Sequence, residues 1–257
     1  MSLVKQFEKM GVRVKIDSSR SGCVLNIRND KKGEYFDIQK GPNVDVAVVD
    51  LRPKERHLLL SVNEDNKKSK FLCGHDERHW FVAAIPEKGS NVYNVDSAMD
   101  ALKPKEVHEA QRKANVRNSK KNRRHNKGYI RQGEWFFLPD PNLKVDDSLI
   151  LKNEPIRRGR GKPHNCEELY RTGGETVWVC SRYPNGLTEA AYKKVINTPG
   201  YNHNSYRWQV MRRDALVYVR GKITHKDHAT ITLPCWHKVV MNTETNSRAM
   251  AQMAFLD

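Results

Sequence analysis

The sequence predicts an α+β fold in which strands dominate, arranged as antiparallel sheets or small barrels with a few short helices. Short stretches that alternate apolar and polar residues recur along the chain, as strands with one buried face do. Clusters of glycine, asparagine and serine separate these stretches, which is typical of tight turns. Only a few short segments combine good helix formers with a capping residue, so helices are expected to be a minor component.

Residues 1–95 are expected to form an N-terminal β-rich domain. Ser2 can cap a short helix that places Leu3, Val4 and Phe7 on one face, and Gly11 can end it. The strands expected after this helix are Val12–Ile16, Val24–Ile27, Tyr35–Ile38, Val44–Leu51, His57–Val62, Phe71–Cys73 and Trp80–Ile85.

Residues 96–128 are expected to form a helical segment followed by a basic arm. A first helix is predicted to begin at Ser97 and to cover Ala98–Leu102. Pro104, two residues further on, is expected to end it. Good helix formers over Glu106–Ala114 predict a second helix, which runs into the basic residues.

Residues 129–257 are expected to form a C-terminal α+β domain. Ile130–Leu138 is predicted as one strand rich in aromatic residues, and the prolines that follow it indicate a loop. Thr188 is a suitable cap for a helix that reaches Ile196. The other strands expected here are Glu175–Ser181, Tyr206–Met211, Leu216–Ile223, Ala229–Leu233 and Trp236–Met241.

The composition is strongly basic, with 46 Lys and Arg against 30 Asp and Glu, and a formal net charge of +16. This balance favours a nucleic acid or another anionic surface as partner. No apolar run approaches the roughly 20 residues that span a bilayer, and the N-terminus has no signal-peptide core. We therefore expect a cytoplasmic protein without a membrane partner. The five cysteines are scattered, which argues against a disulfide framework.

A long block of positive charge lies between Ala110 and Gly133, with nine Lys and Arg residues and no Asp or Glu. Like charges at short spacing repel, so such a block does little for a fold. It suits a polyanion, because each neutralised phosphate releases condensed counterions. We expect a phosphate-binding arm that is flexible until it binds; a solvated loop, or a tail that contacts an acidic protein, is the alternative. The residues predicted to contact phosphate are Arg117, Lys120, Lys121, Arg123, Arg124 and Lys127.

A second basic run is rich in glycine, so its backbone could approach an anion closely. Its candidate phosphate ligands are Arg157, Arg158, Arg160 and Lys162. Tyr129 and Trp135 lie near the first block and are candidates for stacking on unpaired bases. Since no groove-reading motif is evident and aromatics accompany the charge, RNA is preferred over DNA.

Histidine and cysteine residues gather near the C-terminus as His225-x-x-His228 and Cys235-x-His237. Zinc takes four such ligands tetrahedrally, and a hairpin could bring them together, so this set is a candidate zinc site. Surface histidines that form hydrogen bonds beside a nucleic acid are the alternative. No other cofactor is expected. His225, His228 and His237 are also candidate catalytic residues, since the imidazole pKa suits acid and base catalysis near neutral pH.

Residues His228–Leu233 resemble the His-x-Thr/Ser-apolar strand of two-histidine phosphoesterases. That resemblance implies general acid and base catalysis on an RNA phosphodiester, for which a second motif is needed. His203-Asn204-Ser205 is the other match in the chain, at a spacing too short for two lobes.

Two longer segments, Arg131–Pro139 and Arg220–Glu244, resemble a family of uncharacterised bacterial proteins with an Arg-Gln-Gly-Glu-Trp-Phe segment and a Trp-His segment near the end. The family has no established activity, so the resemblance implies none. The sequence therefore favours a nucleic-acid-binding protein. A histidine- or metal-dependent phosphodiesterase and an assembly subunit of a ribonucleoprotein or phage complex are the alternatives.

Overall fold

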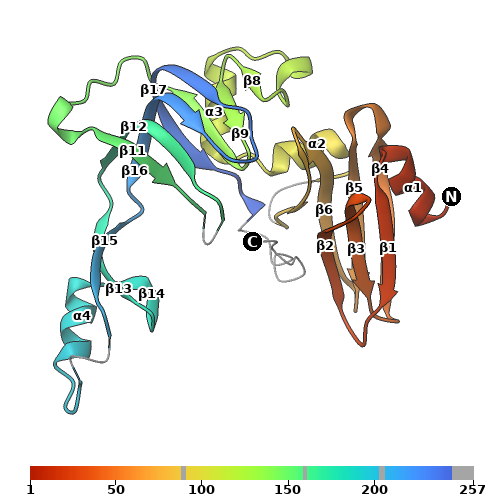
Figure 1. The fold of residues 1–257 in the computed structure, drawn as a ribbon, viewed down its shortest axis with the longest axis horizontal. Helices are drawn as coiled ribbons and strands as arrows, with labels where there is room; N and C mark the ends of the chain where they lie inside the picture. Colours follow the sequence, from red (N-terminus) through yellow and green to blue (C-terminus); the bar gives the residue numbers. More distant parts are fainter. Residues whose placement is uncertain (88–90, 159–160, 203–205, 245–257) are drawn as a thin grey trace.

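The computed structural model describes residues 1–87, 91–158, 161–202 and 206–244. Strands dominate it, and most of their pairings are antiparallel, which confirms the predicted α+β class. An N-terminal unit of two sheets lies beside a C-terminal sheet, and a small unit projects from the far end of the latter (Figure 1). None of the helices in the described residues is long and apolar enough to cross a membrane.

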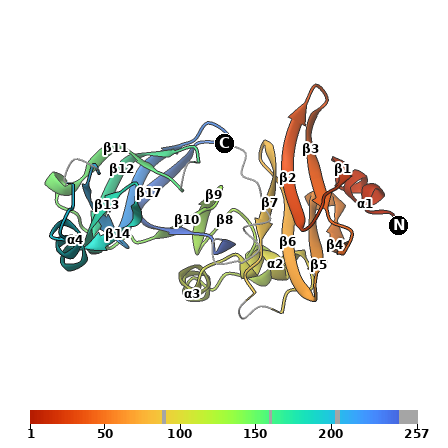
Figure 2. The same cartoon turned by 90° about the horizontal axis from the view of Figure 1, so that it is seen from below.

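The two sheets of the N-terminal unit face each other and share one core (Figure 2). Apolar side chains from both sheets meet in it, among them Leu25 and Phe36 from one and Leu60 and Phe71 from the other. The predicted strands of this region are confirmed, and one pair, β1 with β3, is parallel. The three-stranded sheet has the order β1 (Arg13–Ser18), β3 (Gly33–Lys40), β2 (Cys23–Asp30). The four-stranded sheet has the order β4 (Val44–Arg52), β5 (His57–Glu64), β6 (Lys67–Asp76), β7 (His79–Ala84). A 3-10 turn, η1 (Pro53–Glu55), connects β4 and β5.

The first helix, α1 (Leu3–Met10), is capped as its sequence predicts. The Ser2 hydroxyl accepts a hydrogen bond from the Lys5 amide, and Gly11 ends the helix with a φ of 87°. Phe7 and Met10 on its inner face are buried in the shared core of the two sheets.

The outer face of the four-stranded sheet is covered by α2 (Val95–Ala101), where Val95 and Ala98 pack against Leu59 and Leu72. This helix begins at Val95 and not at Ser97, because Asn94 is its cap. Ser97 completes a capping box: its amide donates to Asn94 Oδ1 at 2.8 Å, and its hydroxyl accepts from the Asn94 amide at 3.0 Å.

Helix α3 (Lys105–Lys113) packs through Val107 on Tyr129, Phe136 and Leu138 of the C-terminal sheet. That sheet has seven strands in the order β11, β12, β16, β17, β10, β9, β8. They are β11 (Leu151–Ile156), β12 (His164–Thr172), β16 (Leu216–Thr224), β17 (Ile231–Met241), β10 (Trp135–Pro139), β9 (Tyr129–Gln132) and β8 (His125–Asn126), with 3-10 turns η2 (Asn118–Lys120) and η3 (Asp147–Leu149).

Three predictions for this sheet are wrong, and all three bear on the site. The expected strand Ile130–Leu138 is a hairpin, because Gly133 takes a φ of 58° and turns the chain between β9 and β10. Strands β11 and β12 were not expected; β11 accommodates Pro155 because it is an edge strand. The two strands expected over 229–241 are one long strand, β17, in which Pro234 is exposed.

The projecting unit contains β13 (Glu175–Cys180), β14 (Tyr183–Thr188), β15 (Gln209–Arg213) and α4 (Glu189–Ile196). The predicted strand over 175–181 and the Thr188 cap of α4 are confirmed. Strand β14 was not expected, and β15 begins at Gln209 instead of Tyr206.

Candidate functional site

The basic segment forms a hollow on the surface of about 510 Å³. The four cations Arg117, Lys120, Arg123 and Lys127 line it and are exposed to solvent, together with His125. None of the described residues that line the hollow is acidic, and none of the four cations forms an ion pair with a described residue. Their charge is therefore available to a ligand. The remaining lining residues are Asn115, Val116 and Asn126.

The segment is held in place mainly through its backbone, and so differs from the flexible arm that the sequence predicts. The backbone carbonyl of Lys121 accepts three hydrogen bonds, from Lys103 Nζ at 3.1 Å, Gln111 Nε2 at 2.7 Å and Tyr129 Oη at 2.7 Å. Asn126 Oδ1 accepts from the amides of Gly128 and Tyr129 at 2.9 and 3.2 Å. The loop is thus ordered without using the side chains of its exposed cations.

Several predicted contact residues have other roles in the structure. Arg124 turns away from the hollow and forms ion pairs with Asp76 and Glu77 of the N-terminal unit. Burial beside Arg131 lowers the pKa of Arg124 to about 10, so it stays charged at neutral pH. Tyr129 is buried under α3 and Trp135 packs against the core of the C-terminal sheet, so neither ring is free to stack on a base.

Two cations of the second basic run are paired with carboxylates. Arg158 pairs with Glu244, and Lys162 Nζ lies 2.8 Å from Asp227 Oδ2. Arg157 is exposed, and Arg160 lies outside the described residues. Arg158 and Lys162 are therefore less available to a phosphate than the sequence predicts.

A cluster of three histidines lies where strands β12, β16 and β17 of the C-terminal sheet begin or end. His164 begins β12, while His225 and His228 lie in the loop between β16 and β17. One ring nitrogen of each lies within 4.8 Å of one from each of the others. The rings are stacked, with centroids 4.1 Å apart for His164 and His225 and 4.6 Å apart for His225 and His228.

The protonation state of the cluster follows from its burial. Desolvation, reinforced by the two neighbouring imidazoles, lowers the pKa of His164 to about 3. Burial likewise lowers the pKa of His225 and of His228. All three rings are therefore neutral near pH 7 and each carries one nitrogen lone pair.

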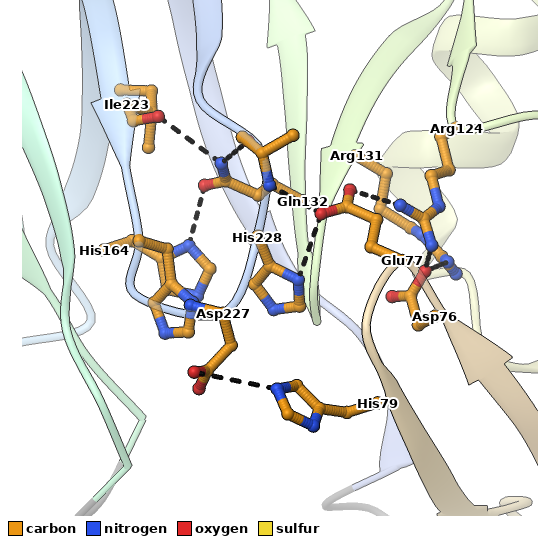
Figure 3. Close-up of polar contacts among 12 residues, drawn as sticks. Asp76, Glu77, His79, Arg124, Arg131, Gln132, His164, Ile223, Asp227 and His228 are labelled. Carbon is orange, nitrogen blue, oxygen red and sulfur yellow. Dashed lines mark hydrogen bonds and ion pairs between the residues drawn. The ribbon is translucent and has the colours of Figure 1, made fainter.

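Gln132 fixes which nitrogen of His164 carries the lone pair (Figure 3). Its amide nitrogen donates to the carbonyls of Ala229, at 2.7 Å, and Ile223, at 3.4 Å. Its oxygen is therefore the atom that faces His164 Nδ1, at 2.9 Å, and it can only accept. The proton of His164 is thus on Nδ1, and Nε2 presents its lone pair to the cluster.

The N-terminal unit reaches this cluster through the turn between β6 and β7. Glu77 Oε2 accepts a hydrogen bond from the Ala229 amide at 2.6 Å and lies 3.6 Å from His228 Nδ1 (Figure 3). His79 begins β7 directly after this turn, and its Nε2 lies 3.8 Å from Asp227 Oδ1. The two units are therefore joined by charged and polar groups at the cluster itself.

A smaller hollow of about 290 Å³ lies along this junction. His125 lines both this hollow and the basic one, so the two adjoin. Its other lining residues include Glu77, whose carboxylate faces His228, and Arg131.

The structure joins only part of the predicted zinc set. His225 and His228 come together, but Cys235 and His237 lie in β17, and neither belongs to the cluster formed by the described residues. His237 is buried, and its Nδ1 lies 2.7 Å from the carbonyl oxygen of Cys235. His203, which belongs to the second phosphoesterase-like match, lies outside the described residues.

Sequence reasoning missed His164, Gln132, Glu134 and Glu77. Buried and exposed residues alternate from His164 to Glu167 in the structure, but only Cys166 of these four is apolar in the sequence, so the local strand signal is weak. The Gln132-Gly133-Glu134 stretch was interpreted as part of a strand although glycine is a turn residue. No local signal marks Glu77, because it reaches the site from the other unit.

No family model matches this chain, and neither a curated protein nor a solved structure matches it. The resemblance of Arg131–Pro139 and Arg220–Glu244 to a bacterial family therefore stays a prediction.

Proposed function

We propose that this protein binds nucleic acid, with the phosphate backbone held in the basic hollow. The observation that carries the proposal is the hollow itself, where four unpaired cations converge on about 510 Å³ of solvent-accessible space. Neutralising phosphates at these cations would release counterions and drive binding.

The fixed backbone of the loop favours high affinity for the ligand. The Lys121 carbonyl is held by three donors, so the cations are presented from a fixed backbone. A preorganised site avoids the entropic cost of ordering a loop when the ligand arrives. Only the four long side chains then lose freedom on binding.

RNA remains the preferred ligand. Helix α3 ends at Lys113, before the hollow begins at Asn115, so none of the described residues that line the hollow belongs to an α-helix that could enter a groove. A single strand can follow the hollow without such a helix. We therefore expect single-stranded RNA to bind more tightly than duplex DNA of the same length.

Binding is tested by replacing Arg117, Lys120, Arg123 and Lys127 together with glutamine and measuring RNA affinity over a range of salt concentrations. Each phosphate contact contributes about 0.7 to the slope of log K against log salt for single strands, so losing four flattens the slope by about 3. The measurement is fluorescence anisotropy with a labelled oligonucleotide.

The matched control replaces four exposed lysines of the N-terminal unit with glutamine, so that both variants carry the same net charge. These are Lys5, Lys31, Lys32 and Lys54. The control should keep nearly all of the wild-type slope. Equal losses in the two variants, or no binding by the unmodified protein at low salt, would exclude the basic hollow as the site.

A histidine- or metal-dependent phosphodiesterase is the second candidate, favoured by one observation. The hollow that adjoins the basic one is lined by Glu77, whose carboxylate lies 3.6 Å from His228 Nδ1. A bound strand could thus bring a phosphodiester to the histidines. Cleavage of labelled RNA by the unmodified protein, and its loss in His228→Asn, would support this activity; binding without cleavage, with or without added Zn²⁺, would leave the binding function alone.

A further inference from the structure

We propose that His164, His225 and His228 bind one zinc ion, with Gln132 and Glu77 as outer partners that orient two of the rings. The inference does not depend on nucleic-acid binding. It rests on ligand type, on spacing and on which nitrogen atoms carry lone pairs.

The spacing of the three rings is close to that of a zinc site. Zinc binds imidazole nitrogen at about 2.0–2.1 Å in tetrahedral geometry, which places two ligand nitrogens about 3.3 Å apart. The ring nitrogens here lie within 4.8 Å of one another. Small rotations of His225 and His228, which are only partly buried, are enough to close this difference.

One histidine is oriented by a hydrogen bond at Nδ1, because Gln132 Oε1 accepts the Nδ1 proton of His164 at 2.9 Å. In metal sites the ligating histidine usually donates its second nitrogen to a carboxylate or carbonyl in this way, so His164 offers Nε2 as the ligand atom. The Glu77 carboxylate lies 3.6 Å from His228 Nδ1, too far for a hydrogen bond, but its negative charge favours a proton on that nitrogen. His228 is therefore expected to offer Nε2 as well.

His228 Nδ1 is also a buried polar atom that lacks a hydrogen-bond partner among the described residues. Such an atom carries a free-energy cost unless something compensates it. A metal on Nε2 makes the Nδ1 proton more acidic and strengthens its attraction to Glu77. The metal thus accounts for a feature that the protein alone leaves unfavourable.

His225 supplies the third lone pair. Its Nδ1 accepts the backbone amide of Asp227 at 3.1 Å, so this nitrogen is unprotonated in the neutral ring. Coordination exchanges the hydrogen bond from the Asp227 amide for a bond to the metal. The exchange is local, because Asp227 stays anchored by its ion pair with Lys162.

The chemistry of the ligands selects the class of metal. Three imidazoles suit zinc and other late transition metals, whereas Mg²⁺ and Ca²⁺ prefer oxygen ligands. Three protein ligands also leave one position of a tetrahedral site open for water. Glu134 Oε2 lies 3.9 Å from His164 Nε2, which places a carboxylate where it can hydrogen-bond to that water.

The test is zinc binding to protein stripped of metal with a chelator, measured without nucleic acid by competition with a chromophoric chelator and by elemental analysis. We expect one zinc per chain. His164→Asn and His228→Asn should each lose at least 100-fold in affinity, while Gln132→Leu should lose 10–100-fold, as outer-partner substitutions do. Asparagine retains an amide donor in place of Nδ1–H, so the packing is disturbed little.

His125→Asn and His237→Asn are the matched controls, because neither residue belongs to the cluster, and both should bind zinc as the unmodified protein does. If a cluster variant fails to fold, NMR of ¹⁵N-histidine in the unmodified protein replaces it: zinc should shift three imidazole nitrogens. Less than one zinc per chain, equal losses in the controls, or no shifted imidazoles would overturn the proposal. Because RNA is absent from every measurement, failure here is distinct from failure of the basic hollow.

Discussion

The basic hollow and the histidine cluster are assembled in opposite ways. The hollow is lined only by residues between Asn115 and Lys127, so its chemistry is local in sequence. The cluster needs His164 from β12, two histidines from the loop before β17, and Glu77 from the other unit. A local site can be recognised from a charge run, whereas a convergent site depends on which strands become neighbours.

The same contrast appears between two adjacent residues. Arg123 is exposed and lines the hollow, whereas Arg124 points to Asp76 and Glu77 and joins the two units. The sequence makes the two arginines equivalent. Their side chains differ in surroundings because one faces solvent at the hollow and the other faces the carboxylates of the N-terminal unit.

The largest expected effect separates these two arginines. Arg124→Ala should lower the free energy of unfolding by about 2 kcal/mol, because it removes the cation that Asp76 and Glu77 share and leaves them only Arg131 and the Ala229 amide. Breaking a fully buried pair costs about 3–5 kcal/mol, and Arg124 is 34% exposed. Arg123→Ala should change stability by no more than about 0.5 kcal/mol but weaken RNA binding. Urea unfolding and anisotropy titrations measure the two effects, and the opposite pattern would show that the binding site extends to the junction.

An intermediate effect is expected from Gly133→Ala, which tests how tightly the cluster is packed. Gly133 has a φ of 58°, and a Cβ there would lie 2.9 Å from His228 Nε2 and 3.4 Å from His164 Cε1. The left-handed backbone alone costs about 1–2 kcal/mol. The crowded rings should also lose at least tenfold in zinc affinity, while RNA affinity stays unchanged.

Gly173→Ala is the control for this substitution. Gly173 has a φ of 68° and no atom within 4 Å of the position of a Cβ. It should show the backbone cost without any loss of zinc affinity. If both variants bind zinc normally, the rings tolerate the methyl group and the cluster is looser than its geometry indicates.

The smallest effect concerns His237, which the sequence groups with the zinc ligands and the structure does not. Burial lowers the pKa of His237 below its ordinary value of 6.5. Below pH 6.5 the unfolded chain therefore binds a proton that the folded chain does not, and stability falls as the pH decreases, by up to about 1.4 kcal/mol per pH unit. Above pH 6.5 both states are neutral there and the contribution is constant.

His237→Asn should remove this part of the acid sensitivity and leave zinc affinity unchanged. The asparagine amide can still donate to the Cys235 carbonyl, which the His237 ring approaches at 2.7 Å. Thermal unfolding from pH 7.5 to 5 compares the slopes of the two proteins. A loss of zinc binding in this variant would show that His237 is a zinc ligand after all.

Much of the fold was predictable because its signals are local. The Ser2 and Thr188 caps are confirmed, as is the alternation that defines the N-terminal strands. The hairpin at Gly133 was missed because its aromatic flanks resemble one continuous strand. Strand β12 was missed because the prolines and glycines before it indicate a loop. His164, the first residue of that strand, was therefore not predicted as a site residue.

The sequence by itself determined the strand-dominated class, the excess of positive charge and the stretch where unpaired cations gather, because composition, alternation and charge runs are properties of neighbours in the chain. Tertiary structure decided which cations stay free, since Arg124 and Lys162 found carboxylates far away in sequence. Tertiary structure also decided that His164 joins His225 and His228. Strand pairing brings β12 beside β16, and no local pattern encodes which distant strand a histidine will face.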